Sequence, residues 1–91
     1  MENQVKLSSS IIIDCDEETN KKYLMNIENG SIYNLNDVAF FIVDSIKNEK
    51  TVDECIEELI TLTNNQVPRE QIIEDTNKYI DELLLAGIVY E

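Results

Sequence analysis

Residues 31–42 read SIYNLNDVAFFI, and the spacing of the apolar side chains changes within this stretch. Ser31 to Asn34 is a short segment with a β-branched and an aromatic residue, which favours a strand. From Asn36 onward the apolar residues recur about every 3.6 residues, the period of a helix, and asparagine is favoured at a helix N-cap. The sequence therefore predicts a strand that leads directly into a helix.

The residues before this stretch predict two more strands and two turns. Ile11 to Ile13 is a β-branched run that predicts a strand, and the charged cluster from Asp14 to Asn20 predicts the turn after it. Tyr23 to Ile27 predicts the second strand. Asn29 and Gly30 predict a tight two-residue hairpin turn, because both residue types tolerate a positive φ.

Two further helices are predicted after the first one. Thr51 and Glu54 have the spacing of a capping box, in which each side chain bonds the backbone amide of the other residue. This pair predicts the start of the second helix. Pro68 is suited to the first turn of a third helix, which we expect to run to Ala86, with Gly87 as the residue that ends it.

Together these elements predict an α+β fold of the winged helix-turn-helix type, a three-stranded antiparallel β-meander followed by three helices. We expect residues 1–91 to form a single domain, because a chain of 91 residues holds one hydrophobic core at most. Met1 to Ser10 is mostly polar and predicts a loose arm or the lead into an edge strand. The apolar segment Ile88 to Tyr90 is expected to pack back on the core.

The chain has 19 acidic and 7 basic residues and a net charge of −12 at pH 7. A field of this sign repels the phosphates of nucleic acids and anionic lipid surfaces. Met1 to Ser10 lacks the basic start and apolar run of a signal peptide, and the longest apolar run, Val38 to Val43, is too short to span a bilayer. We therefore expect a soluble, cytoplasmic protein that binds neither nucleic acid nor membranes.

The chain lacks the residue combinations that catalysis and metal binding need. It contains no histidine, so its two cysteines, Cys15 and Cys55, form neither a zinc cluster nor a Cys–His nucleophile pair. We expect both thiols to be free in a reducing compartment. The acidic residues are spaced along the predicted helices, which indicates a solvated face. The sequence therefore predicts no catalytic residue, no metal site and no cofactor.

Three segments of the chain resemble the PqqD family, the recognition elements that serve enzymes modifying ribosomally synthesised peptides (RiPP recognition elements). Residues 32–42 are similar to the family's strand, Leu-Asn pair and following helix, and residues 51–56 resemble the start of its second helix. Residues 75–88 resemble its closing helix, which has an Asp, an aromatic-aliphatic pair, a Leu pair and a Gly before an aliphatic residue. The chain departs from the family pattern in lacking a Trp in the first helix and in having Thr76 where an aliphatic residue is usual.

The resemblance implies a domain that binds the leader segment of a precursor peptide and presents the precursor to a partner enzyme, such as a radical SAM maturase, a cyclase or a protease. The implied mode of binding is strand addition, in which the leader pairs with the edge of the third strand and its side chains enter pockets beside the last helix. The peptide-binding residues expected on the strand are Ser31, Ile32, Tyr33 and Asn34. Those expected along one flank of the helix are Arg69, Ile73, Thr76, Asn77 and Ile80, of which Thr76 and Ile80 also fit a purely core position.

Two other functions share parts of this pattern. Asp44-Ser45-Ile46 is similar to the phosphopantetheine attachment site of acyl or peptidyl carrier proteins, but those carriers have no counterpart of the β-rich residues 11–34. A winged-helix DNA-binding regulator inserts its third helix into the major groove. The third helix here contains Arg69 and Lys78 against five acidic residues, so it has no basic face.

The charge of the chain also bears on the charge of the leader. An acidic leader would depend on Arg69 and Lys78, the only bases of the last helix, whereas a basic or neutral leader agrees with the net charge of −12. Exposed bases contribute only about 0–1 kcal/mol each to an ion pair. The composition therefore favours a basic or neutral leader.

Overall fold

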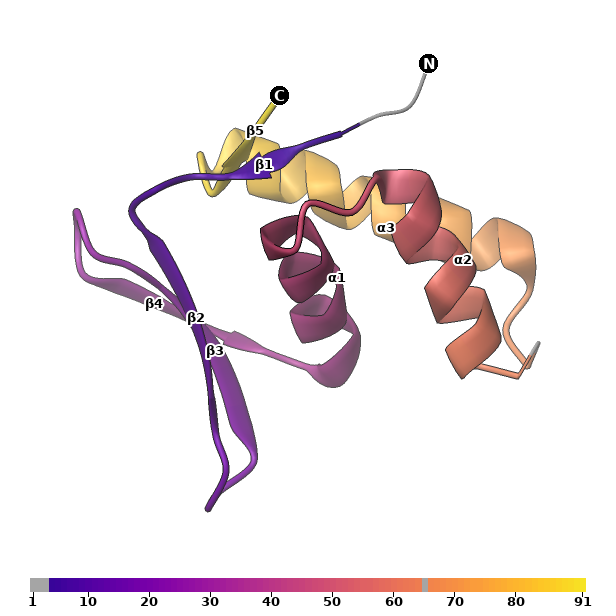
Figure 1. The fold of residues 1–91 in the computed structure, drawn as a ribbon, viewed down its shortest axis with the longest axis horizontal. Coiled ribbons are helices and arrows are strands. Elements are labelled where there is room, and N and C mark those ends of the chain that lie inside the picture. The colour runs from indigo at the N-terminus through magenta and orange to yellow at the C-terminus, as the bar shows by residue number, and fades with distance from the viewer. Residues whose placement is uncertain (1–3, 65) are drawn as a thin grey trace.

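The computed structural model describes residues 4–64 and 66–91. Its elements are β1 (Lys6–Leu7), β2 (Ile11–Asp16), β3 (Lys21–Asn26), β4 (Ser31–Leu35), α1 (Asp37–Lys47), α2 (Val52–Leu62), α3 (Arg69–Leu85) and β5 (Val89–Tyr90). Strands β2, β3 and β4 form an antiparallel sheet in that order, and β1 pairs with β5. Figure 1 shows the sheet on one side of the molecule and the three helices on the other. The predicted α+β fold, a three-stranded meander followed by three helices, is confirmed.

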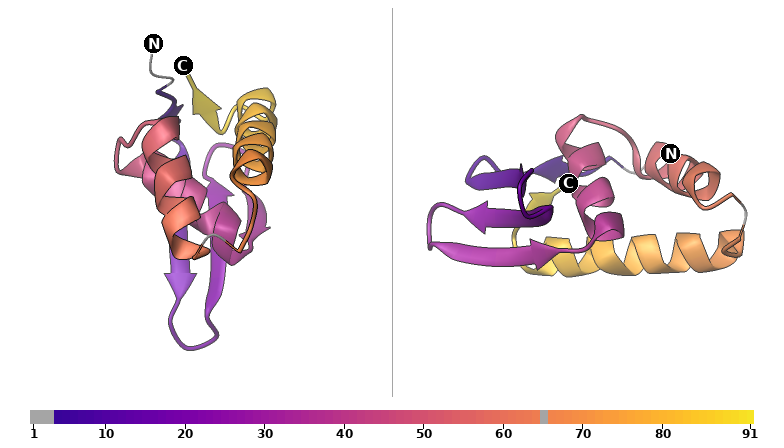
Figure 2. Two further views of the ribbon diagram at one scale, coloured as in Figure 1. Left: turned by 90° about the vertical axis from the view of Figure 1, so that its right-hand side faces the viewer. Right: turned by 90° about the horizontal axis from the view of Figure 1, so that it is seen from below.

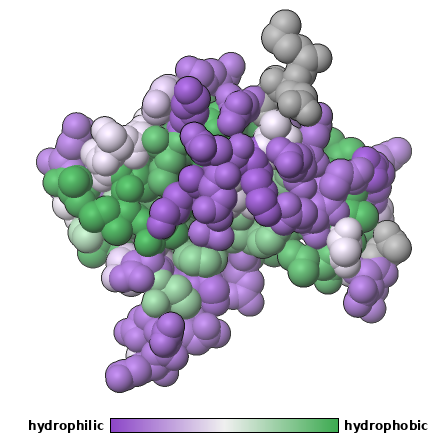
Figure 3. Space-filling view, in the orientation of Figure 1, coloured by the Kyte–Doolittle hydropathy of each residue, from purple (hydrophilic) through white to green (hydrophobic). Residues whose placement is uncertain are grey.

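Pairing across the sheet places alternate side chains on opposite faces. Leu24 of β3 pairs with Ile13 of β2 and with Tyr33 of β4, and Leu24 is fully buried, so this face packs on the core. Ile12 and Ile32 belong to the other face and are 45% and 62% exposed. Figure 3 shows apolar surface over the sheet and polar surface at the tip of the β2–β3 hairpin.

The turn between β3 and β4 is longer than the two-residue turn that the sequence predicts. Asn26 pairs with Ser31, so residues 27–30 form the loop. The Gly30 amide donates to the Asn26 carbonyl at 2.8 Å, and Gly30 has a φ of 73°. The Asn29 side chain accepts a hydrogen bond from the Ser31 amide at 2.9 Å. The predicted hairpin is confirmed, but its turn type is wrong, because the Asn29 side chain stabilises a longer loop.

The charged cluster predicted as the first turn belongs partly to β2, which continues to Asp16. Asp14 is exposed on the outer face of the sheet and accepts a hydrogen bond from the Tyr23 hydroxyl at 3.2 Å. An antiparallel sheet with one solvated face accommodates charged residues on that face. The strand therefore extends beyond its apolar run.

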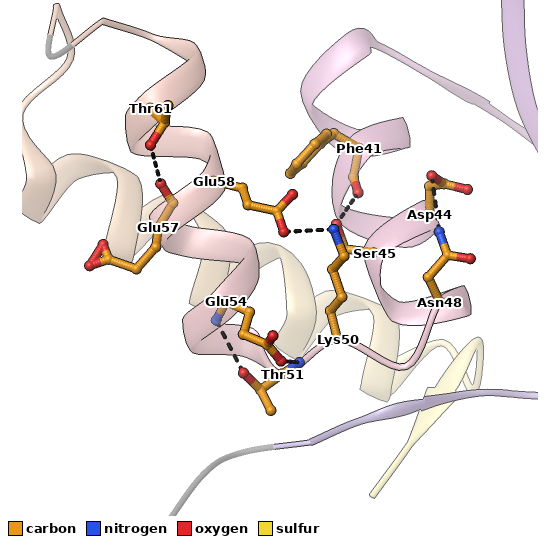
Figure 4. Close-up of polar contacts among 10 residues, drawn as sticks. All are labelled: Phe41, Asp44, Ser45, Asn48, Lys50, Thr51, Glu54, Glu57, Glu58 and Thr61. Carbon is orange, nitrogen blue, oxygen red and sulfur yellow. Dashed lines mark hydrogen bonds and ion pairs between the residues drawn. The ribbon is translucent and has the colours of Figure 1, made fainter.

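Side chains cap the first two helices as the sequence predicts. Asn36 Oδ1 accepts a hydrogen bond from the Ala39 amide at 2.7 Å. At the start of α2 the Glu54 amide donates to Thr51 Oγ1 at 3.1 Å, and the Thr51 amide donates to Glu54 Oε1 at 2.9 Å (Figure 4). The backbone hydrogen bond from Thr51 holds the pKa of the Glu54 carboxyl below its ordinary value. The capping box is therefore confirmed.

The third helix, α3, begins at Arg69, directly after Pro68, and ends at Leu85, one residue before the predicted end. Gly87 lies beyond it with a φ of 75°, the left-handed conformation that lets the chain leave a helix. One stripe along α3 is buried and consists of Ile72, Thr76, Ile80 and Leu83. This stripe joins the core, which all the helices and the sheet share.

The N-terminal segment is part of the fold from residue 4 onward. Strand β1 pairs with β5, so the first and last strands lie side by side (Figure 1), and Val5 is only 4% exposed. The Ser8 amide donates to the Ile88 carbonyl at 2.9 Å, and the Ser8 hydroxyl donates to the Gly87 carbonyl at 2.8 Å.

Of the two expectations for this segment, the loose arm is therefore wrong for residues 4–10, whereas the lead into an edge strand is confirmed, because residues 8–10 connect β1 to the edge strand β2. Residues 1–3 lie outside the described residues. The arm is held by a partner strand at the opposite end of the sequence, which the local polarity of the arm does not reveal. The expectation that the apolar tail packs on the core is confirmed for Ile88 and Val89, which are buried, but not for Tyr90, which is 51% exposed.

Replacing Val5 by alanine should lower the free energy of unfolding by about 1.5–3 kcal/mol, because the substitution removes buried apolar surface. Lys6→Ala, at the exposed neighbouring position, is the control and should change it by less than about 0.5 kcal/mol. Urea unfolding followed by circular dichroism measures both values. Equal effects of the two substitutions would show that the N-terminal segment contributes nothing to the core.

Replacing Thr51 by alanine should lower the free energy of unfolding by about 0.5–2 kcal/mol, because it removes the cap of α2. Thr61→Ala makes the same change at an exposed position inside α2 and should have little effect. Folding lowers the pKa of Glu54 from 4.5, so this carboxylate stabilises the fold above that pH and loses its contribution as pH falls through the lower folded value. Thr51→Ala keeps the backbone amide that bonds Glu54, so most of this pH dependence should remain in that variant. Glu54→Gln should instead differ in stability from wild type by an amount that shrinks in acid, and a difference independent of pH would contradict the role of Glu54.

Candidate functional site

Strand β4 is an open edge of the sheet. Among the described residues it pairs with β3 on one side and with no strand on the other. Ile32, Tyr33 and Asn34 are all exposed. An open edge presents unpaired N–H and C=O groups to any extended chain that approaches it.

The register of the sheet identifies the amides that face the open edge. The Ile27 amide donates to the Ser10 carbonyl at 2.9 Å, on the side of β2. Because amides alternate in direction along a strand, the Asn26 amide faces β4, and the amide of its partner Ser31 faces β3. The amide of Ile32, the next residue, therefore faces the open edge, and so does the amide of Asn34.

An apolar groove lies at the end of this edge. It has a volume of about 330 Å³ and is lined by Asn36, which follows β4, and by residues of α1, of α2, of the segment before α3 and of α3. Val38 lines it and is 55% exposed although apolar. Figure 2 shows that β4 is the strand of the sheet nearest to α3. The open edge and the groove are therefore on the same side of the molecule.

An ion pair links the start of α1 to the sheet. Lys22 Nζ of β3 lies 3.0 Å from Asp37 Oδ1 at the start of α1, and 5.8 Å from the centroid of the Phe40 ring. The Lys22 side chain is only 17% exposed, so its stem packs against protein. The Asp37 side chain is 88% exposed, so the ion pair itself contributes little stability, but it lies where the first turn of α1, with its groove-lining residues, meets the sheet.

Asp75 and Tyr79 bring polar groups to the groove. Gln71 Nε2 donates to Asp75 Oδ1 at 2.8 Å, which orients the carboxylate. Burial raises the pKa of the Tyr79 hydroxyl above its ordinary value of 10.0, and the charge of Glu82 raises it further. The groove therefore has apolar walls and one flank with negative charge.

The structure separates the predicted peptide-binding residues into groups. Ser31, Ile32, Tyr33 and Asn34 lie on β4, at the open edge. Thr76 lines the groove but is only 2% exposed. Ile80 is 6% exposed and belongs to the core.

The remaining three predicted residues lie on the other flank of α3. Arg69, Ile73 and Asn77 line a separate hollow together with residues of α2. The Arg69 guanidinium donates to both carboxylate oxygens of Glu57 on α2, at 2.7 and 3.0 Å. The sequence-based expectation requires these three residues to lie beside β4. The structure instead places them beside α2.

Helical periodicity identifies the buried stripe of α3 but not the flank that faces the sheet. Ile73 and Asn77 border the stripe on one side, and Asp75 and Tyr79 border it on the other. Each pair contains one polar and one apolar or aromatic residue, so only the packing of α2 distinguishes them. Asp75 and Tyr79 were missed for this reason, although both belong to the segment that carries the family resemblance.

Metal binding and membrane insertion find no support in the described residues. Within residues 4–64 and 66–91, no group of three His, Cys, Asp or Glu side chains could hold a metal ion. No helix in that part of the chain is long and apolar enough to cross a membrane. Cys55 is buried, which raises the pKa of its thiol.

The chain is similar to proteins of one family. The family described as coenzyme PQQ synthesis protein D (PqqD) matches residues 22–89. A solved structure of TbiB1 in complex with the TbiA(beta) leader peptide is similar with a TM-score of 0.77 and 15% sequence identity, over 92% of this chain and 93% of that chain. At this identity the likeness shows the fold. No curated protein matches the chain.

The Tyr79 hydroxyl should titrate above pH 10.0, and Glu82→Gln should lower its pKa part of the way back, because burial remains. Glu74→Gln removes the same charge from α3 at an exposed position and should leave the Tyr79 pKa unchanged. Carbon NMR of ring-labelled tyrosine, assigned with Tyr79→Phe, measures the titration. An unshifted Tyr79 in wild type would contradict the position of its ring in the groove wall.

Proposed function

The chain belongs to the PqqD family, and we propose that it binds the leader segment of a ribosomally synthesised precursor peptide and presents the precursor to a partner modifying enzyme. The observation that carries the proposal is the open edge of β4 beside an apolar groove. The TbiB1 structure, which has the same fold, contains a bound leader peptide. Binding is the role of this chain, and the chemistry belongs to the partner enzyme, such as a radical SAM maturase, a cyclase or a protease, in the cytoplasm.

Strand addition at β4 explains how such a leader binds. An extended leader continues the sheet by bonding the outward amides of β4, the first of which is that of Ile32. Side chains of a strand alternate between the two faces of the sheet. Alternate leader side chains therefore point towards α3 and its groove, while the others point away from the core.

The two kinds of interaction have different tasks. Main-chain hydrogen bonds are available to any sequence, so they supply affinity with little selectivity. The groove, with Val38 and Tyr79 in its wall, accepts apolar side chains of suitable size and supplies the selectivity. We expect affinities roughly in the nanomolar to micromolar range.

Two alternative functions fit the structure less well. The Ser45 side chain is 4% exposed, and its hydroxyl donates to the Phe41 carbonyl at 2.8 Å (Figure 4), so it is not available to carry a phosphopantetheine arm. A DNA-binding third helix needs a basic face. The exposed acidic residues of α3 are Glu70, Glu74, Asp75, Asp81 and Glu82.

Calorimetric titration with synthetic leaders from short reading frames that neighbour the gene tests the proposal. Ile32→Pro should weaken leader binding roughly 3- to 10-fold, because it removes one outward hydrogen-bond donor. Ile32→Ala keeps this amide and controls for the loss of the side chain. Tyr33→Pro is not an equivalent test, because the register directs the Tyr33 amide toward β3; this variant loses a hydrogen bond within the sheet and should destabilise the fold.

Circular dichroism shows whether each variant is folded. If none of these leaders binds the wild-type chain, the proposed function is wrong. If a leader binds folded Ile32→Pro as tightly as Ile32→Ala, the protein binds peptides by another mode than strand addition.

A further inference from the structure

The groove-facing flank of α3 places two carboxylates on either side of one aromatic ring. Asp75, Tyr79 and Glu82 are spaced by four and three residues, so they lie on the same side of the helix. Asp75 lines the groove together with Tyr79. Glu82 follows Tyr79 by three residues, so it lies one helical turn beyond the ring on the same flank, next to the residues that line the groove.

The bases near the groove do not neutralise this flank. Lys22 is paired with Asp37 at 3.0 Å. Arg69 is on the opposite flank of α3 and is paired with Glu57 at 2.7 Å. Lys78 lies one turn from Asp75 and one turn from Glu82, so it compensates at most one of the two carboxylates.

From this arrangement we infer that the groove selects a cationic leader, in which a Lys or Arg contacts Asp75 or Glu82 and a neighbouring large apolar side chain occupies the groove. The inference rests on the proposed function and specifies its substrate class. The apolar walls anchor the apolar side chain, and the carboxylates determine which charge the leader has beside it. An acidic leader would place like charges together in a partly desolvated groove, which is costly.

The net charge of the whole chain acts in the same direction. At −12 the chain attracts cationic peptides from a distance and repels anionic ones. This long-range attraction depends on the total charge, whereas contact with Asp75 and Glu82 depends on position. An experiment that separates the two must keep the total charge equal and change only where the carboxylates are.

The variant Asp75→Asn/Glu82→Gln removes two charges from the groove flank. The matched control Glu74→Gln/Asp81→Asn removes two charges from the adjacent residues, which the helix turns by about 100° away from the groove flank. All four side chains are exposed, so neither variant changes the core. Circular dichroism confirms that both are folded.

The probe is a random peptide library displayed on its encoding nucleic acid, with peptides long enough to span β4 and the groove. Selection on immobilised full-length wild type should enrich Lys or Arg at one fixed distance from an aromatic or branched aliphatic residue. The selected peptide should bind the groove variant at least about tenfold more weakly, as expected for loss of a charge-assisted contact. The control variant should change its affinity by no more than about twofold, as expected for exposed charges.

The outcomes separate this inference from the function on which it rests. If Ile32→Pro weakens the selected peptides but they have no fixed basic position, the strand-addition site stands and the inference of a cationic leader is wrong. Equal losses in the two charge variants overturn it too, because total charge would then explain the preference. If the selected peptides bind Ile32→Pro as tightly as Ile32→Ala, they bind elsewhere, and the proposed site itself fails.

Discussion

A single residue, Asn36, separates the edge strand β4 from helix α1, and this short connection determines where the candidate site lies. Its side chain accepts a hydrogen bond from the Ala39 amide at 2.7 Å, so the helix begins immediately after the strand. The first turn of α1 is thereby held at the end of the open edge, where the Lys22–Asp37 ion pair links it to β3. A longer connection would allow α1 to pack elsewhere and would separate the groove from the edge.

The helix α3 serves two purposes with its different sides. Its buried stripe, which includes Thr76 and Ile80, belongs to the core, and the flank with Arg69 is tied to α2 through Glu57. The other flank, with Asp75 and Tyr79, is left to line the groove. The core covers the buried stripe of α3 and α2 lies along one flank, so the remaining flank can contact a ligand. In this way one helix of a small domain contributes to both the core and the candidate binding site.

The closure of the chain on itself supports this arrangement. Strand β1 pairs with β5 directly after α3, and Val5 is buried there. A domain of this size buries a modest share of its surface, so each buried side chain matters more than in a larger protein. In the separate three-stranded sheet β2 and β4 are the two edge strands, and β4 is the one that leads into the groove.

The sequence by itself determined the order of the three-stranded meander and the three helices and the starts of the helices, but not β1 or the start of β3, which begins at Lys21 instead of Tyr23. The change of period at Asn36, the capping box at Thr51 and Glu54, and Gly87 after the last helix are local signals, because each depends on residues within one turn. The same locality explains why Ser31 to Asn34 could be assigned to a strand and, with the family resemblance, to the candidate site.

Tertiary structure alone decided which flank of α3 lies beside the groove and that residues 4–10 are held by the C-terminus. Both depend on contacts between segments far apart in the sequence, and the periodicity of a helix or the polarity of an arm is the same whichever partner it meets. By sequence alone Arg69, Ile73 and Asn77 are therefore as good candidates as Asp75 and Tyr79, and only the packing places the first three beside α2 and the other two at the groove near β4. The direction of the β4 amides was undetermined for the same reason, because it follows from the register with β3 and β2 and not from the composition of the strand.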